Sequence, residues 1–72
     1  MQYAVVIEKS PTGFGAYVPD LPGCAAVAET ETEVRSLIRE AIGFHLEALR
    51  DDGEPIPQPA ARVEYVEVAH AA

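Results

Sequence analysis

The amino-acid sequence predicts a small α+β domain of the order β-β-β-α-β, with an antiparallel sheet and one helix packed on one of its faces. Residues 5–7 are a β-branched run, and the reverse-turn cluster Ser10-Pro11-Thr12-Gly13 follows them. One stretch with helical spacing of apolar residues lies between Thr30 and Gly53. The 72 residues allow a single domain over the whole chain, 1–72.

The first two predicted strands, at 3–8 and 14–18, flank the turn cluster and form a hairpin. Because side chains alternate across a strand, Tyr17 lies on the face opposite to Phe14. Both strands therefore carry apolar residues on both faces, and one helix can cover only one face. Because a large apolar face should not remain exposed to water, we predict a homo-oligomer, a dimer or tetramer, formed through that face or through an edge strand.

Three further segments complete the predicted domain. A short strand of small residues is expected at 24–28, and a last strand at 62–68, where valine or tyrosine alternates with glutamate. Between helix and last strand, the prolines of 55–59 predict a stiff, extended return segment. Residues 69–72 are expected to form a frayed tail.

The predicted helix has well-defined ends. Thr30 and Glu33 have the spacing of a capping box, in which the hydroxyl accepts an unpaired N–H and the carboxylate reaches back to the cap. Gly53 is the expected stop. The apolar residues of this segment fall on one stripe: Val34, Leu37, Ile38, Ala41, Ile42, Leu46 and Leu49.

Composition limits the possible partners. Twelve acidic residues and five basic ones give a net charge of −7. This charge argues against binding to the phosphate backbone of a nucleic acid and favours a basic protein partner. The single cysteine excludes an internal disulfide framework and fits a reducing cytoplasm. No apolar run approaches the roughly 20 residues needed to span a bilayer, so no membrane association is expected.

Residues able to support catalysis are scattered. His45 and His70 are far apart in the sequence, and Cys24 is read as a small buried hydrophobe without a neighbouring base. Glu8 and Asp20 end two neighbouring predicted strands, and a metal site shared by their carboxylates is one interpretation. The simpler one is that Asp20 is a turn residue that bonds its own backbone. We expect no enzyme, no metal and no cofactor.

Two motifs carry a resemblance to a known family. Pro19-Asp20-Leu21-Pro22-Gly23-Cys24, preceded by Gly15-Ala16-Tyr17-Val18, resembles the signature of HicB-like antitoxins. Asp52-Gly53-Glu54-Pro55-Ile56-Pro57 is a second match, and the likeness covers about residues 1–68. The resemblance implies a β-β-β-α-β domain with a partial ribonuclease H-like topology.

The resemblance also implies inhibition by binding. Antitoxins of this kind bind a small, basic toxin that cleaves messenger RNA, and they mask its active site. Many members continue into a helix-turn-helix or ribbon-helix-helix segment that binds operator DNA. This sequence ends soon after the last predicted strand, so we expect no DNA binding from it. The alternatives are a stand-alone oligomeric protein with another ligand and a metal-dependent nuclease using Asp20.

The proline motif suggests where a partner would bind. Our hypothesis is that Tyr17, Asp20 and Leu21 contribute to the contact, because they lie in or beside a rigid crossover between two strands. The alternative is that the crossover is architectural, since Pro22 and Gly23 would fix the turn and the strand register whether or not anything binds.

Overall fold

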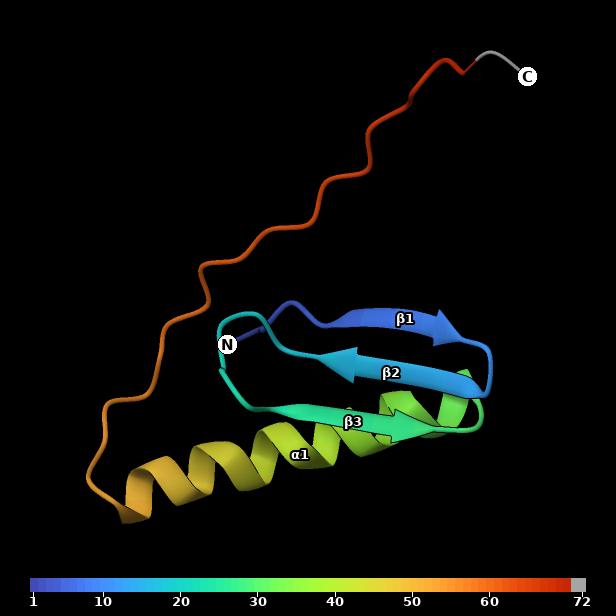
Figure 1. Cartoon of the computed structure of the whole chain (residues 1–72). Helices are drawn as coiled ribbons and strands as arrows, with labels where there is room; N and C mark the ends of the chain where they lie inside the picture. Colours follow the sequence, from blue (N-terminus) through green and yellow to red (C-terminus); the bar gives the residue numbers. More distant parts are fainter. Residues whose placement is uncertain (71–72) are drawn as a thin grey trace.

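Three antiparallel strands and one helix make up the fold over residues 1–70, which the computed structural model describes (Figure 1). The strands are β1 (Val6–Ser10), β2 (Gly13–Tyr17) and β3 (Ala25–Ala28), and they lie in the order β1-β2-β3. The helix α1 (Glu31–Asp51) follows β3. The expected α+β class and the order of these four elements are confirmed, with β1 beginning and ending later than the predicted 3–8.

The β1–β2 hairpin is closed by a two-residue turn between Ser10 and Gly13. Gly13 has a steric reason to be glycine. A Cβ at this position would lie 2.4 Å from the carbonyl oxygen of Ala28 on β3, which is too close for any side chain. The absence of a side chain therefore lets β2 and the end of β3 approach each other.

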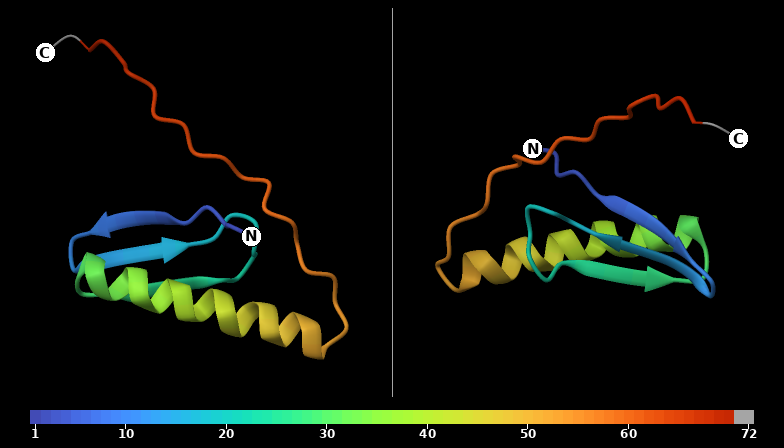
Figure 2. Two further views of the ribbon diagram at one scale, coloured as in Figure 1. Left: turned by 180° about the vertical axis from the view of Figure 1, so that it is seen from behind. Right: turned by 45° about the horizontal axis from the view of Figure 1, so that its top comes forward.

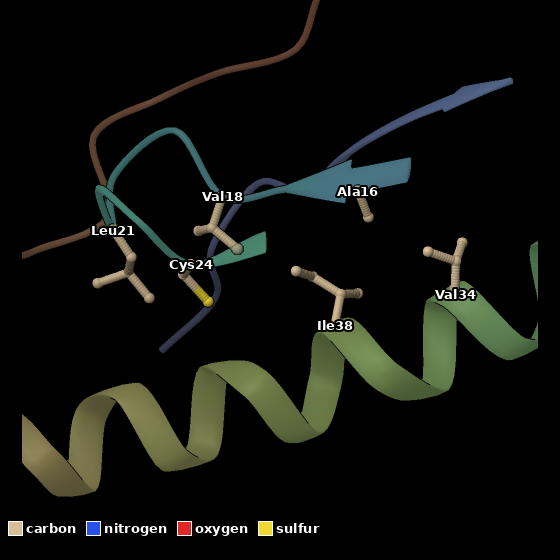
Figure 3. Packing of buried hydrophobic residues seen from close by; sticks show 6 residues of the cluster. All are labelled: Ala16, Val18, Leu21, Cys24, Val34 and Ile38. Atoms are coloured by element: carbon tan, nitrogen blue, oxygen red, sulfur yellow. The ribbon is translucent and has the colours of Figure 1, made fainter. Parts of the chain in front are cut away.

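The core lies between the sheet and the helix, which packs against β3 and β2 rather than β1 (Figure 2). Val34 and Ile38 of α1 point toward the sheet, as the helical stripe predicts (Figure 3). The other buried members come from β2 and the crossover that follows it: Ala16, Val18, Leu21 and Cys24. The side of α1 next to β1 is consequently left less covered than the side next to β3.

Both helix ends are capped by local hydrogen bonds. The Thr30 hydroxyl accepts the backbone N–H of Glu33 at 3.1 Å and donates to the Glu33 carboxylate at 2.9 Å, so the carboxylate meets the hydroxyl rather than the backbone N–H of the cap. At the other end, Gly53 has φ +70° and donates to Arg50, while Glu54 donates to Leu49. This pair of bonds is a Schellman motif, and it confirms Gly53 as the stop.

Thr30→Ala is expected to lower the free energy of unfolding by about 1 kcal/mol, because it removes the side-chain oxygen that satisfies an N–H of the first turn. Urea unfolding followed by circular dichroism measures the change. Thr32→Ala is the matched control, since Thr32 is exposed inside the first turn and should change stability by only a few tenths. Equal effects of the two substitutions would contradict the capping role.

The last predicted strand is absent from the described residues, and this expectation was wrong for the isolated chain. Residues 62–70 run away from the sheet as an extended, exposed segment (Figures 1 and 2). A strand needs a hydrogen-bonded neighbour, and here the segment has not joined the free edge of β1. The ribonuclease H-like topology therefore stays a prediction. Of the expected tail at 69–72, residues 71 and 72 lie outside the described residues.

Within residues 1–70, α1 offers no stretch that is both long and apolar enough to cross a bilayer.

Candidate partner-binding surface

The crossover between β2 and β3 consists of two consecutive turns. Leu21 donates its N–H to the Val18 carbonyl at 3.0 Å, and Cys24 donates to the Leu21 carbonyl at 3.0 Å. Val18 donates to Cys24 at 3.1 Å, which extends the pairing of the two strands by one step. Pro19 and Pro22 each occupy the second position of a turn, where their fixed φ is favourable. Gly23 supplies the positive φ, +85°, that the second turn requires.

The crossover also supplies part of the core. Leu21 is fully buried, and Val18 and Cys24 are nearly so (Figure 3). The expectation that Leu21 contacts a partner directly is therefore corrected to a packing role, because its side chain does not reach the surface. Burial also raises the pKa of the Cys24 thiol, which keeps it protonated and unreactive at neutral pH.

Asp20 joins the crossover to the segment after the helix. Its carboxylate accepts the backbone N–H groups of Ala60 and Ala61, each at 3.0 Å. Tyr3 adds a second attachment, because its hydroxyl donates to the Pro57 carbonyl. The expected bond of Asp20 to its own turn is thus replaced by a long-range clamp. This clamp holds the proline motif of the crossover against the segment that follows the second motif.

Asp20→Ala is expected to free the N–H groups of Ala60 and Ala61, since both lose their acceptor. A charge-assisted bond contributes about 1 kcal/mol or more, so amide exchange at these two positions should accelerate by about fivefold. Hydrogen exchange followed by NMR measures this directly. Asp51→Ala, at an exposed helical carboxylate, is the control, and unchanged exchange in Asp20→Ala would contradict the clamp.

Tyr17 lies on the sheet face that α1 leaves uncovered. It is opposite Val6 on β1 and Ala25 on β3 in the strand register, and it is about half exposed. Val27 of β3 is on the same face and is largely exposed. This face, defined here as the open sheet face, is the accessible surface beside the crossover.

A second surface, missed from the sequence, lies on the outward side of α1. Leu37 and Phe44 are one heptad apart, and Phe44 is 71% exposed. Leu37, which the sequence placed on the apolar stripe with Val34 and Ile38, is 42% exposed at the border of that stripe. Acidic residues with the same 4-3 spacing flank them on the same side of the helix: Glu33, Glu40, Glu47 and Asp51. We call these six residues the acidic stripe. The position of Phe44 outside the core stripe was the signal that could have revealed it.

The described residues hold no obvious centre for catalysis. Within 1–70, no group of three or more His, Cys, Asp or Glu side chains is placed to hold a metal ion. His45 is half-buried on α1, whereas His70 is exposed at the end of the extended segment. Asp20 is committed to two backbone N–H groups.

Comparison with known proteins gives the family. The model of the HicB-like antitoxins of bacterial toxin-antitoxin systems matches residues 3–71. The chain belongs to the HicB-like antitoxin family. An uncharacterized 14.9 kDa protein of Haemophilus phage HP1 is 36% identical to it over 66 residues, 92% of this chain and 50% of the phage protein. This HicB-like chain thus spans half the length of that relative.

Shorter relatives match over most of their length. A UPF0150 protein of Thermoplasma acidophilum is 39% identical, with 85% of this chain and 90% of that protein covered. A UPF0150 protein of Archaeoglobus fulgidus is 40% identical, covering 75% and 83%. Among solved structures, a chain of a HicA3 and HicB3 toxin-antitoxin complex matches with a TM-score of 0.71 and 35% identity, over 83% of this chain and 70% of that chain.

Proposed function

We propose that this chain binds a small, basic, messenger-RNA-cleaving toxin of the HicA type in the cytoplasm and inhibits it by covering its active site. The observation that carries the proposal is the likeness to a chain of a solved HicA3 and HicB3 complex, together with a family match over nearly the whole chain. An antitoxin family favours a role in binding over a role in catalysis.

Charge supports a basic partner. The net charge of −7 creates a negative field that attracts a positively charged protein and raises the rate of encounter. Protein interfaces typically have apolar side chains at their centre and charged side chains around them. The acidic stripe on α1 has this composition, and Phe44 is its largest exposed side chain.

We place the main toxin contact on the acidic stripe and treat the open sheet face around Tyr17 as the competing location. Asp20 can contribute through its remaining acceptor capacity at the crossover, but its two backbone bonds give it a structural task as well. Leu21 contributes only by supporting the crossover from inside.

The test begins with the gene next to the one that encodes this chain. Expression of an adjacent small, basic reading frame should arrest growth, and co-expression of this chain should restore it. The two proteins should co-purify at low salt and separate as salt is raised. Failure to bind or to restore growth would reject the proposal and favour a stand-alone oligomeric protein.

A further inference from the structure

The C-terminal segment Arg62–Val68 exposes most of its apolar side chains to water. Val63, Tyr65, Val66 and Val68 are between 59% and 95% exposed. The segment begins directly after the clamp at Ala60 and Ala61, so its starting point is fixed although the rest is free. Contiguous exposed apolar residues of this kind mark a binding element.

A groove with an apolar floor runs between β1 and α1. Ile7, Ile38 and Ile42 line it together with Tyr3 and Val5, Ala61 and Tyr65 from the chain's own C-terminal part border it, and its volume is about 1270 Å³. It opens where α1 leaves β1 uncovered, and β1 is an edge strand with unpaired backbone N–H and C=O groups. The groove therefore offers an apolar floor and a row of hydrogen-bonding groups, which is what an added strand requires.

The charges of the groove and of the segment are opposite. Lys9, Arg35 and Arg39 line the groove, and its acidic member, Glu31, is paired with Arg35 at 2.7 Å. The groove is thus locally positive in a chain whose net charge is −7. The segment Arg62–Val68 carries two glutamates and one arginine. An acidic and apolar strand fits this groove better than a basic one does.

We propose that Arg62–Val68 of a second copy of this chain adds to β1 as a fourth strand and that the two copies exchange these segments. The chain's own segment passes the border of this groove at Ala61 and Tyr65 without pairing with β1, and it then projects from the domain (Figure 2). The exchange is reciprocal, because each copy offers one segment and one groove, so the assembly closes as a two-fold dimer.

Exchange supplies three things that the isolated chain lacks. It pairs the free edge of β1, buries Val63 and Tyr65 on the face of the segment that meets the groove, and brings Glu67 of the same face to the basic residues there. A domain of 72 residues buries a limited core, and association with a second copy is a common remedy. Exchange does not require the toxin, since both surfaces belong to this chain.

The full chain should have twice the 7.7 kDa mass of one copy in size-exclusion chromatography with light scattering. Successive N–H groups of a strand point to opposite sides, so Glu64→Pro combined with Tyr65→Pro removes one bond to β1 in any register. This double variant should shift to the monomer mass. The control, Ala69→Pro with His70→Pro, lies beyond the added strand and should remain dimeric.

A second measurement does not depend on a variant that folds. In a mixture of isotope-labelled and unlabelled copies of the unmodified chain, filtered NOE spectra should show contacts from the Tyr65 ring of one copy to β1 side chains of the other. Contacts confined to one copy, a monomeric unmodified chain, or a dimer that survives the double proline variant would each overturn the proposal.

Discussion

Leu21→Ala is expected to lower the free energy of unfolding by about 2 to 5 kcal/mol, the range for truncating a buried leucine in a packed core. Leu21 is fully buried between the crossover and α1, and its backbone takes part in both turns of the crossover. A domain of this size has about 4 to 10 kcal/mol of stability in total. The substitution should therefore remove a large share of the stability and lower the urea midpoint clearly.

Leu37→Ala is the matched control for this prediction. It is the same chemical change, but Leu37 is 42% exposed on α1, and alanine is a strong helix former. Its cost should stay below about 1 kcal/mol. Urea unfolding monitored by circular dichroism compares the two. A cost for Leu21→Ala no greater than that for Leu37→Ala would show that the crossover is not part of the core.

Phe44→Ala is expected to weaken toxin binding by about thirtyfold, the loss that follows from removing an aromatic side chain at the centre of an interface, about 2 kcal/mol. Phe44 is largely exposed, so its removal creates no cavity, and alanine favours the helix. Stability should therefore be unchanged while affinity falls. Isothermal titration calorimetry with the toxin measures the dissociation constant.

Tyr17→Ala is the counterpart on the open sheet face. It also truncates one exposed aromatic side chain, at the place that the sequence motif favours. If the acidic stripe carries the contact, Tyr17→Ala should bind the toxin within about threefold of the unmodified chain. The opposite pattern, with the loss confined to Tyr17→Ala, would move the contact to the sheet.

The elements with strong local signals were predictable from the sequence. Thr30 and Gly53 bound the helix as expected, because capping is decided by residues within one turn. The crossover was predictable for the same reason, since Pro22 and Gly23 determine a turn almost alone. The hairpin followed from alternation and from its turn residues.

Long-range features were harder to predict. The clamp from Asp20 to Ala60 joins residues 40 apart, and nothing in the local sequence of either one indicates the other. The last strand was predicted from alternation at 62–68, but alternation gives the propensity to pair and not the partner. Leu21 was expected at a partner contact because it lies in the rigid crossover, whereas here its side chain is directed inward.

The acidic stripe shows a further reason why a binding surface is difficult to find. Its members have the same helical spacing as core residues, and their exposure becomes evident only after the sheet has been placed against the neighbouring side of α1, which carries Val34 and Ile38. Phe44 then stands apart from Val34 and Ile38, which face the sheet. Packing, and not composition, decides which apolar residues remain for a partner.

Cleavage of messenger RNA by the adjacent-gene toxin, measured with increasing amounts of this chain, tests the central claim most directly. Cleavage should fall in proportion to the added chain and stop once the chain is in excess, and Phe44→Ala should shift this titration to higher concentrations. Undiminished cleavage in the presence of excess, folded chain would contradict the proposal that it inhibits by covering the active site.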